Sequence, residues 1–209
     1  MAITSMRLQA TLQWLWLNLK FLAGAFCLTG FLIWLFPSAM LDFYAKWTTL
    51  MQAAGAKNIA ELSMQADMFK HILSANALTT LLFFAIGLVL QSPIAMSLAG
   101  IFYALVSFLA PLAVGRSFGV NDWFLVGSEA FTLLFGTSLA SAIAGELFGV
   151  KATVPSIWGY WKNNWSKLMP TPVDNWKIVI RGWMRLFSIG AIILGGLLIF
   201  VAWFETYGY

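Results

Sequence analysis

Five apolar stretches, each long enough to cross a lipid bilayer as a helix, constrain this chain more than any other feature. They cover residues 19–36, 69–90, 94–114, 124–150 and 178–204. A helix of about 20 apolar residues spans the hydrocarbon core of a bilayer. Charged residues make up only 10% of the sequence, against roughly 25% in soluble domains. We therefore predict one all-α domain over residues 1–209, a polytopic transmembrane helical bundle with about five spans.

Prolines punctuate these stretches. Pro37 follows the first, Pro93 separates the second from the third, and Pro111 lies within the third. Proline lacks a backbone N–H and clashes with the preceding helical turn. We expect Pro37 and Pro93 to mark helix ends or starts, and Pro111 to kink or end its helix.

Two longer connections are expected to lie at the membrane surface. Residues 38–68 have broken helical periodicity, which predicts one or two short helices with a break at Gly55. Residues 151–177 carry four lysines and four tryptophans. Tryptophan favours the headgroup region and lysine reaches toward phosphate. An interfacial amphipathic helix that binds anionic lipids around residues 151–185 is the natural interpretation.

The distribution of basic residues predicts a cytoplasmic N-terminus. Lysine and arginine are enriched in the cytoplasmic loops of membrane proteins. With five spans and the N-terminus inside, eight basic residues fall inside and four outside. Those inside are Arg7, Lys20, Lys151, Lys162, Lys167, Lys177, Arg181 and Arg185, and those outside are Lys46, Lys57, Lys70 and Arg116. The distribution therefore predicts a cytoplasmic N-terminus and a C-terminus on the outside.

Several function classes are disfavoured by the residues present. The net charge of +4 is small and scattered, which argues against nucleic acid as a partner. Cys27 and His71 are the only residues of their kinds, so neither a disulfide nor a typical histidine metal site is expected. The chain has no phosphate-binding loop, zinc-protease motif or nucleophile elbow. We predict a protein that is not an enzyme and holds no cofactor.

Pigment binding is an alternative because the chain has eleven tryptophans and one histidine. His71 could be a lone axial ligand to a pigment, although an interfacial histidine at a helix start explains it more simply. The tryptophans cluster near the span ends, where an aromatic belt would place them. They are Trp14, Trp16, Trp34, Trp47, Trp123, Trp158, Trp161, Trp165, Trp176, Trp183 and Trp203.

Glu129 lies within the fourth apolar stretch, at a depth where a carboxylate is costly and so usually has a partner or a role. Asn76, Thr79 and Thr80 of the second stretch are expected at a similar depth. Neither a carboxylate nor an amide finds water in hydrocarbon, so a hydrogen bond from Asn76 to Glu129 would satisfy both. A protonation site, an ion path or a partner contact is the alternative role for Glu129.

Glu146 follows Glu129 by 17 residues. At the helical rise this separates the two carboxylates by roughly 25 Å, too far for a paired acid and base. Glu146 is expected near the cytoplasmic headgroups, either solvated or paired with Lys151, Arg181 or Arg185.

Small residues in the fourth stretch predict close helix packing. Gly136, Ala140 and Ala144 recur at every fourth position, and such rows let another helix backbone approach closely. Ala95 and Ala99 in the third stretch, or Ala191 and Gly195 in the fifth, could face this row. A groove for a partner helix or a lipid is the alternative.

From about Phe69 onward the layout resembles the stage II sporulation protein M family of membrane proteins. The resemblance rests on the segments FKHILSANALTTLLFFAIGLVL, VGSEAFTLLFGTSLASAIAG and WKIVIRGWMRLFSIGAIILGGLLIFVAWFE. By position, it implies that Asn76, Gly87, Glu129, Gly136 and Glu205 are the polar and small positions of that family. The usual His-Gly-x-x-Glu is replaced by residues 126–129, with a shorter spacing and no histidine. The resemblance implies a non-enzymatic membrane scaffold, located in the inner membrane of a bacterium or archaeon.

These observations leave three expectations for function. The first is an integral membrane scaffold or accessory subunit that binds other membrane protein subunits. The second is a permease-like transport component in which Glu129 and Asn76 line a polar path. The third is a subunit of a pigment-binding or electron-transfer complex.

Overall fold

The computed structural model describes residues 2–53, 65–89, 92–113, 119–148, 150, 152 and 175–207. These residues form six α-helices and no strand: α1 (Ala2–Leu35), α2 (Pro37–Ala53), α3 (Gln65–Leu88), α4 (Ser92–Ala113), α5 (Val120–Phe148) and α7 (Trp176–Tyr207). All but α2 are long and apolar enough to cross a membrane. The predicted fold class is confirmed, and the chain is a multi-pass membrane protein.

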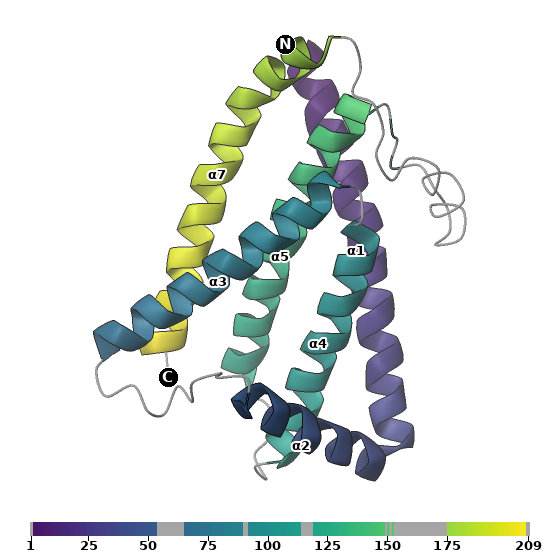
Figure 1. The fold of residues 1–209 in the computed structure, drawn as a ribbon, viewed down its shortest axis with the longest axis vertical. Coiled ribbons are helices and arrows are strands. Elements are labelled where there is room, and N and C mark those ends of the chain that lie inside the picture. The colour runs from purple at the N-terminus through teal and green to yellow at the C-terminus, as the bar shows by residue number, and fades with distance from the viewer. Residues whose placement is uncertain are drawn as a thin grey trace.

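Helix α5 is the centre of the bundle (Figure 1). It packs against α1 and α4 on one side and against α3 and α7 on the other. Every residue of α5 from Thr132 to Gly145 is buried except Phe135, which is half-buried. The other spanning helices pack around α5, and α1, α3 and α7 leave most of their residues unburied.

The two ends of the bundle differ in charge. The starts of α1 and α7 lie with the end of α5 at one end (Figure 1). The exposed Arg181 and Arg185 of α7 also lie there, and we call it the basic end. At the opposite end α2 lies across the ends of α1 and α4. We call this the α2 end.

The prolines act largely as predicted. Helix α1 ends at Leu35 and α2 begins at Pro37, the first helical position, where a missing N–H costs nothing. Helix α4 begins at Ser92, so Pro93 lies in its first turn. Helix α4 ends at Ala113, two residues beyond Pro111.

Helix α1 differs most from the prediction, because it begins at Ala2 rather than near residue 19. Polar residues lower the mean hydropathy of the first turns of α1. The apolar stretch predicted from the sequence therefore does not include these turns. The helix nevertheless continues because Trp14, Leu17 and Phe21 pack in the main core cluster with residues of α4, α5 and α7. Tertiary contacts therefore extend this helix beyond its apolar stretch.

Helix α2 accounts for part of the predicted surface segment 38–68. Gly55, with residues 54–64, lies outside the described residues, as does most of segment 151–177. The predicted interfacial helix in that second segment, with Lys151, therefore lies outside the described part of the chain.

The small-residue row on α5 packs mainly against α3. A Cβ added at Gly87 of α3 would lie 2.7 Å from the Thr137 carbonyl oxygen and 2.8 Å from the Ala140 side chain. The Ser141 hydroxyl also donates to the Gly87 carbonyl at 3.3 Å. Only glycine at position 87 allows this approach of the two backbones.

The other members of the row have different neighbours. Gly136 lies next to Thr80 of α3 and Leu194 of α7, and Ala144 is fully buried in the core. The prediction that Ala191 and Gly195 face this row is wrong. Ala191 is exposed and Gly195 has open space around it, whereas Gly190 packs on Leu139 of α5. The packing contacts of α7 therefore turn Gly190, rather than Ala191 and Gly195, toward α5.

Ala95 and Ala99 of α4, which were expected to face the small-residue row, are buried. The close backbone contact of α4, however, is made by the next residue, Gly100, with α1. Ala95 and Ala99 are 2% and 4% exposed. A Cβ on Gly100 would collide with the Leu22 carbonyl of α1. Helices α1 and α4 are therefore in contact through their backbones at this point.

Candidate functional site

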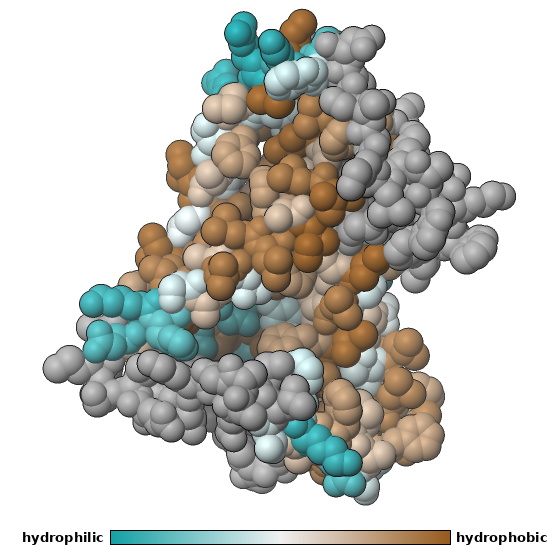
Figure 2. Space-filling model, viewed as in Figure 1, coloured by the Kyte–Doolittle hydropathy of each residue, from teal (hydrophilic) through white to brown (hydrophobic). Residues whose placement is uncertain are grey.

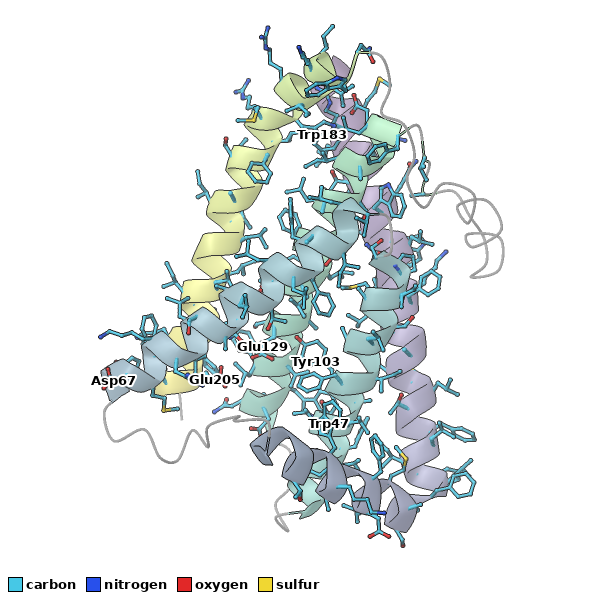
Figure 3. The ribbon with its side chains drawn as sticks, viewed as in Figure 1. Trp47, Asp67, Tyr103, Glu129, Trp183 and Glu205 are labelled. Carbon is cyan, nitrogen blue, oxygen red and sulfur yellow. The ribbon has the colours of Figure 1, made fainter. Side chains whose placement is uncertain are left out.

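Glu129 lies in a polar layer near the α2 end, built by α4, α5 and α7. Figure 3 shows Glu129 on α5, Glu205 on α7 and Tyr103 on α4 around the same region of the bundle. Glu205 and Tyr103 both lie within electrostatic range of the Glu129 carboxyl. Tyr103 is only 5% exposed, and both carboxyl groups are on half-buried residues. Three helices thus bring two carboxyl groups and a phenol together.

The two carboxyl groups have no basic partner among the described residues. The ion pairs found there join Arg7 to Glu146 and Lys70 to Asp67. The Oε2 atom of Glu205 is buried and accepts no hydrogen bond. A pair of uncompensated carboxylates in a low-dielectric environment is unfavourable, so either a bound proton or a counter-charge would stabilise this layer.

The predicted hydrogen bond from Asn76 to Glu129 is not formed. The Nδ2 atom of Asn76 is buried and has no partner. Helix α3 comes into close contact with α5 at Gly87 and diverges from it toward the α2 end (Figure 1). Asn76 lies 11 residues before Gly87, where the two helices have separated. The oblique crossing of α3 and α5 thus prevents this hydrogen bond.

The two threonines near Asn76 have structural roles. The Thr79 hydroxyl donates to the Ala75 carbonyl within its own helix, at 2.9 Å. Thr80 is buried, and its methyl group lies near Gly136. Neither threonine hydroxyl makes a hydrogen bond to Glu129.

A second polar cluster, at the basic end, joins three helices through Glu146. The Arg7 guanidinium of α1 donates two hydrogen bonds to its carboxylate, from Nε to Oε2 at 3.0 Å and from Nη2 to Oε1 at 2.8 Å. The indole Nε1 of Trp183 on α7 donates to Oε2 at 2.7 Å. Arg7 also lies over the Trp183 ring, 5.6 Å from its centre. We call these three residues the Arg7 cluster.

The partners of Glu146 in the structure, Arg7 and Trp183, differ from those predicted. Arg181 and Arg185 are exposed and form no ion pair within the described residues, and Lys151 lies outside them. The preference for Arg7 has a steric reason. Gly182 leaves room for the guanidinium, because a Cβ there would collide with it. A bidentate arginine–carboxylate pair is also stronger than a single contact.

Helices α1 and α5 share a buried hydrogen bond that the sequence pattern did not predict. Asn18 is fully buried and donates from Nδ2 to the Ser138 hydroxyl at 3.0 Å. Arg7, Thr11, Trp14 and Asn18 follow one another at intervals of four, three and four residues. This spacing places them on one face of a helix and could have revealed the polar contact face of α1.

The tryptophans fit an aromatic belt only in part. Trp14 and Trp183 are each 2% exposed and belong to the core. Trp16, Trp34, Trp47, Trp123, Trp176 and Trp203 are each at least 40% exposed, as belt residues would be. Trp158, Trp161 and Trp165 lie outside the described residues. The belt interpretation is therefore wrong for Trp14 and Trp183.

His71 lies in the second turn of α3, at the α2 end. It is half-buried, and its backbone carbonyl accepts a hydrogen bond from Ser74. Over the described ranges, no group of three or more His, Cys, Asp or Glu residues is placed to hold a metal ion. The chain matches no protein-family model, no curated protein and no solved structure.

Proposed function

We propose that the protein is a non-enzymatic scaffold or accessory subunit that binds a helix of another membrane protein. The observation that carries this proposal is the outward face of α7. Of its 32 residues only Val179, Trp183, Gly190, Val201 and Ala202 are buried. On the opposite side Ser188, Ala191 and Gly196 are exposed, and Gly195 has open space around it. A row of small residues that faces lipid allows a second helix backbone to approach closely.

Large apolar side chains flank this row. Ile192 is 75% exposed, Ile199 is 55% exposed and Trp203 is 51% exposed. Small residues with bulky neighbours form a groove and ridges, the surface relief that helices use to pack. A bacterial or archaeal inner membrane, anionic lipid at the basic end and a relation to the stage II sporulation protein M family all fit this proposal.

Site-specific photo-crosslinking in native membranes tests this helix-docking role. We expect benzoylphenylalanine at Ile192 to yield a discrete crosslinked product, because Ile192 borders the small-residue row. The same probe at Phe31, an exposed residue of α1, is the matched control and should give only diffuse lipid products. Gly195→Leu should abolish the product by filling the groove. If position 192 gives no product and the protein extracts gently as a bare monomer, the scaffold proposal fails.

A transport component is the second candidate, favoured by the unpartnered polar atoms near the α2 end. The Asn76 Nδ2 and Glu205 Oε2 atoms are buried without partners, and water or a substrate would satisfy both. Figure 2 shows hydrophilic surface that continues from the start of α3 toward the centre of the molecule. A polar path from the α2 end toward Glu129 would have this appearance.

Thiol accessibility tests the polar path. In a Cys27→Ser background, we expect a small charged methanethiosulfonate reagent to modify Asn76→Cys several-fold faster than Leu78→Cys. Leu78 is on the same helix and is 69% exposed toward the apolar surroundings. Such reagents react with the ionised thiol, which requires water. Equal and slow modification at both positions would show that no water path reaches Asn76.

A further inference from the structure

Helices α1 and α4 run parallel to each other in a fixed register. A Cβ on Gly100 of α4 would collide with the Leu22 carbonyl of α1. Further along, a Cβ on Gly30 of α1 would lie 3.1 Å from the Phe108 ring of α4. Both contacts join residues that are 78 positions apart in the sequence (100 − 22 and 108 − 30). The same offset therefore relates the other facing positions of the two helices.

This register places the start of α4 inside the bundle rather than at the basic end. Ser92 is the first residue of α4, and the offset makes it level with Trp14 of α1. Helix α1 continues for 12 residues from Trp14 to its first residue, Ala2, which is about 18 Å at the helical rise. Figure 1 likewise shows α4 beginning below the ends of α1, α5 and α7.

The first turn of α4 is buried and carries polar groups without partners. Ser92 and Met96 are 0% exposed, and Ala95 is 2% exposed. The Ser92 hydroxyl has no hydrogen-bond partner in the described part of the chain. The first N–H groups of a helix have no acceptor within it, and Pro93 has no N–H. The N–H groups of Ser92 and Ile94 remain, and no carbonyl of the described residues outside the helix accepts from them.

Asn18 provides independent evidence that this part of the core receives a ligand. It lies one turn beyond Trp14 on α1 and is fully buried. Its Nδ2 atom donates to Ser138, but its Oδ1 atom accepts no hydrogen bond from any described residue. Helices α1, α4 and α5 all contact one another, so Asn18 and the start of α4 border the same core. Buried polar atoms in a membrane protein normally have partners.

The start of α4 is an electropositive position. The N-terminus of an α-helix carries about half a positive charge, and the first turn of α4 contains no acidic residue. Gly145 of α5 is at this level, because a Cβ there would lie 3.1 Å from the Trp14 indole nitrogen. The adjacent carboxylate, Glu146, is neutralised by Arg7. A helix N-terminus in such surroundings favours an anion.

We propose that the start of α4 binds one small monovalent anion, either chloride or the carboxylate of a small acid. The N–H groups of Ser92 and Ile94 and the Ser92 hydroxyl donate to the anion. One bound water donates both to the anion and to the Asn18 Oδ1 atom. Discontinuous helices of membrane transporters hold anionic groups at their N-termini in the same way. The site is separate from the outward face of α7, so it does not depend on the scaffold role.

Thermal unfolding of the purified full chain tests the site. We expect sodium chloride or sodium acetate to raise the unfolding midpoint relative to sodium gluconate at equal ionic strength, because the bulk of gluconate excludes it. The shift should grow with the logarithm of the anion concentration, as for any ligand that binds only the folded state. A response to chloride alone identifies an inorganic anion, and a response to acetate identifies a carboxylate.

Ser92→Asp supplies the negative charge from the chain itself. Its unfolding midpoint in gluconate should exceed that of the wild type, and its response to chloride and acetate should be lost. Ser107→Asp is the matched control. Ser107 is on the same helix, is 2% exposed and has no hydroxyl partner among the described residues, but it is remote from the helix start. We expect Ser107→Asp to lower the midpoint in every salt.

Chlorine NMR of the wild-type chain gives a second measurement, which decides the question if Ser92→Asp does not fold. The chloride line should broaden in the presence of the protein and narrow again when excess bromide displaces chloride. Ser92→Ala removes one donor to a charged group, so it should lower the chloride affinity several-fold.

Two results would overturn the anion site. One is an equal unfolding midpoint in chloride, acetate and gluconate together with an unbroadened chloride line. The other is a folded Ser92→Asp variant that keeps the wild-type response to chloride and acetate. Crosslinking from position 192 should be unchanged in Ser92→Asp, so this proposal and the scaffold proposal fail separately.

Discussion

Gly100→Val should be the most destabilising single substitution in the bundle. A Cβ at this position collides with the backbone carbonyl of Leu22 and lies 3.1 Å from the Ala25 side chain. A backbone atom cannot rotate away as the tip of a side chain can, so α1 and α4 must move apart. Overpacking of a core typically costs about 1–3 kcal/mol, and we expect the upper part of this range or more. Unfolding by sodium dodecyl sulfate titration, followed by circular dichroism, measures the loss.

Gly24→Val is the matched control for this substitution. Gly24 is on α1 and has open space where a Cβ would lie. Valine there adds the same atoms to a helix of the same pair without a collision. Its free energy of unfolding should stay within about 0.5 kcal/mol of the wild-type value. Equal losses for the two variants would mean that the close contact of α1 and α4 does not stabilise the fold.

Arg7→Ala should have the second largest effect, about 2–3 kcal/mol of unfolding free energy. The substitution removes both hydrogen bonds of the guanidinium and leaves Glu146 with only Trp183. Breaking a fully buried ion pair costs about 3–5 kcal/mol. The Glu146 side chain is 36% exposed, and water lowers this cost. The same titration of the unfolding transition measures the change.

Substitutions in the Arg7 cluster should lower the free energy of unfolding by different amounts, and each can be compared with a control. Trp183→Phe removes one hydrogen bond to a charged group and should cost about 1.5–3 kcal/mol. A double substitution of Arg7 and Glu146 should cost less than the sum of the single ones, because neither charge is left alone. Arg181→Ala changes the net charge equally, but Arg181 is exposed and outside the cluster. If Arg181→Ala were as destabilising as Arg7→Ala, general charge rather than this contact would be responsible.

Local chemistry made the helices and their boundaries predictable. Apolar length identified five spans, because backbone groups in lipid must satisfy one another within a helix. Pro37 and Pro93 marked boundaries because a proline cannot donate to the preceding turn. Gly136, Ala140 and Ala144 indicated a packing face because small side chains permit backbone contact in any arrangement of helices.

The partners of the polar residues were not predictable in the same way. Asn76 and Glu129 were expected at a similar depth, yet the Nδ2 atom of Asn76 has no partner, because α3 crosses α5 obliquely. Glu146 pairs with a residue 139 positions away rather than with the nearby arginines of α7. A contact of this kind depends on the rotation and tilt of each helix, which a hydropathy pattern does not record.

The sequence by itself determined that this protein is an all-helical membrane protein with five spans, because hydrophobic length and proline chemistry act locally. The tertiary structure alone decided that Glu129, Glu205 and Tyr103 lie in one region of the bundle, that Glu146 binds Arg7 and Trp183, and that the small residues of α7 face outward. Helix crossing and rotation follow from the packing of all the side chains together. No single segment contains that information.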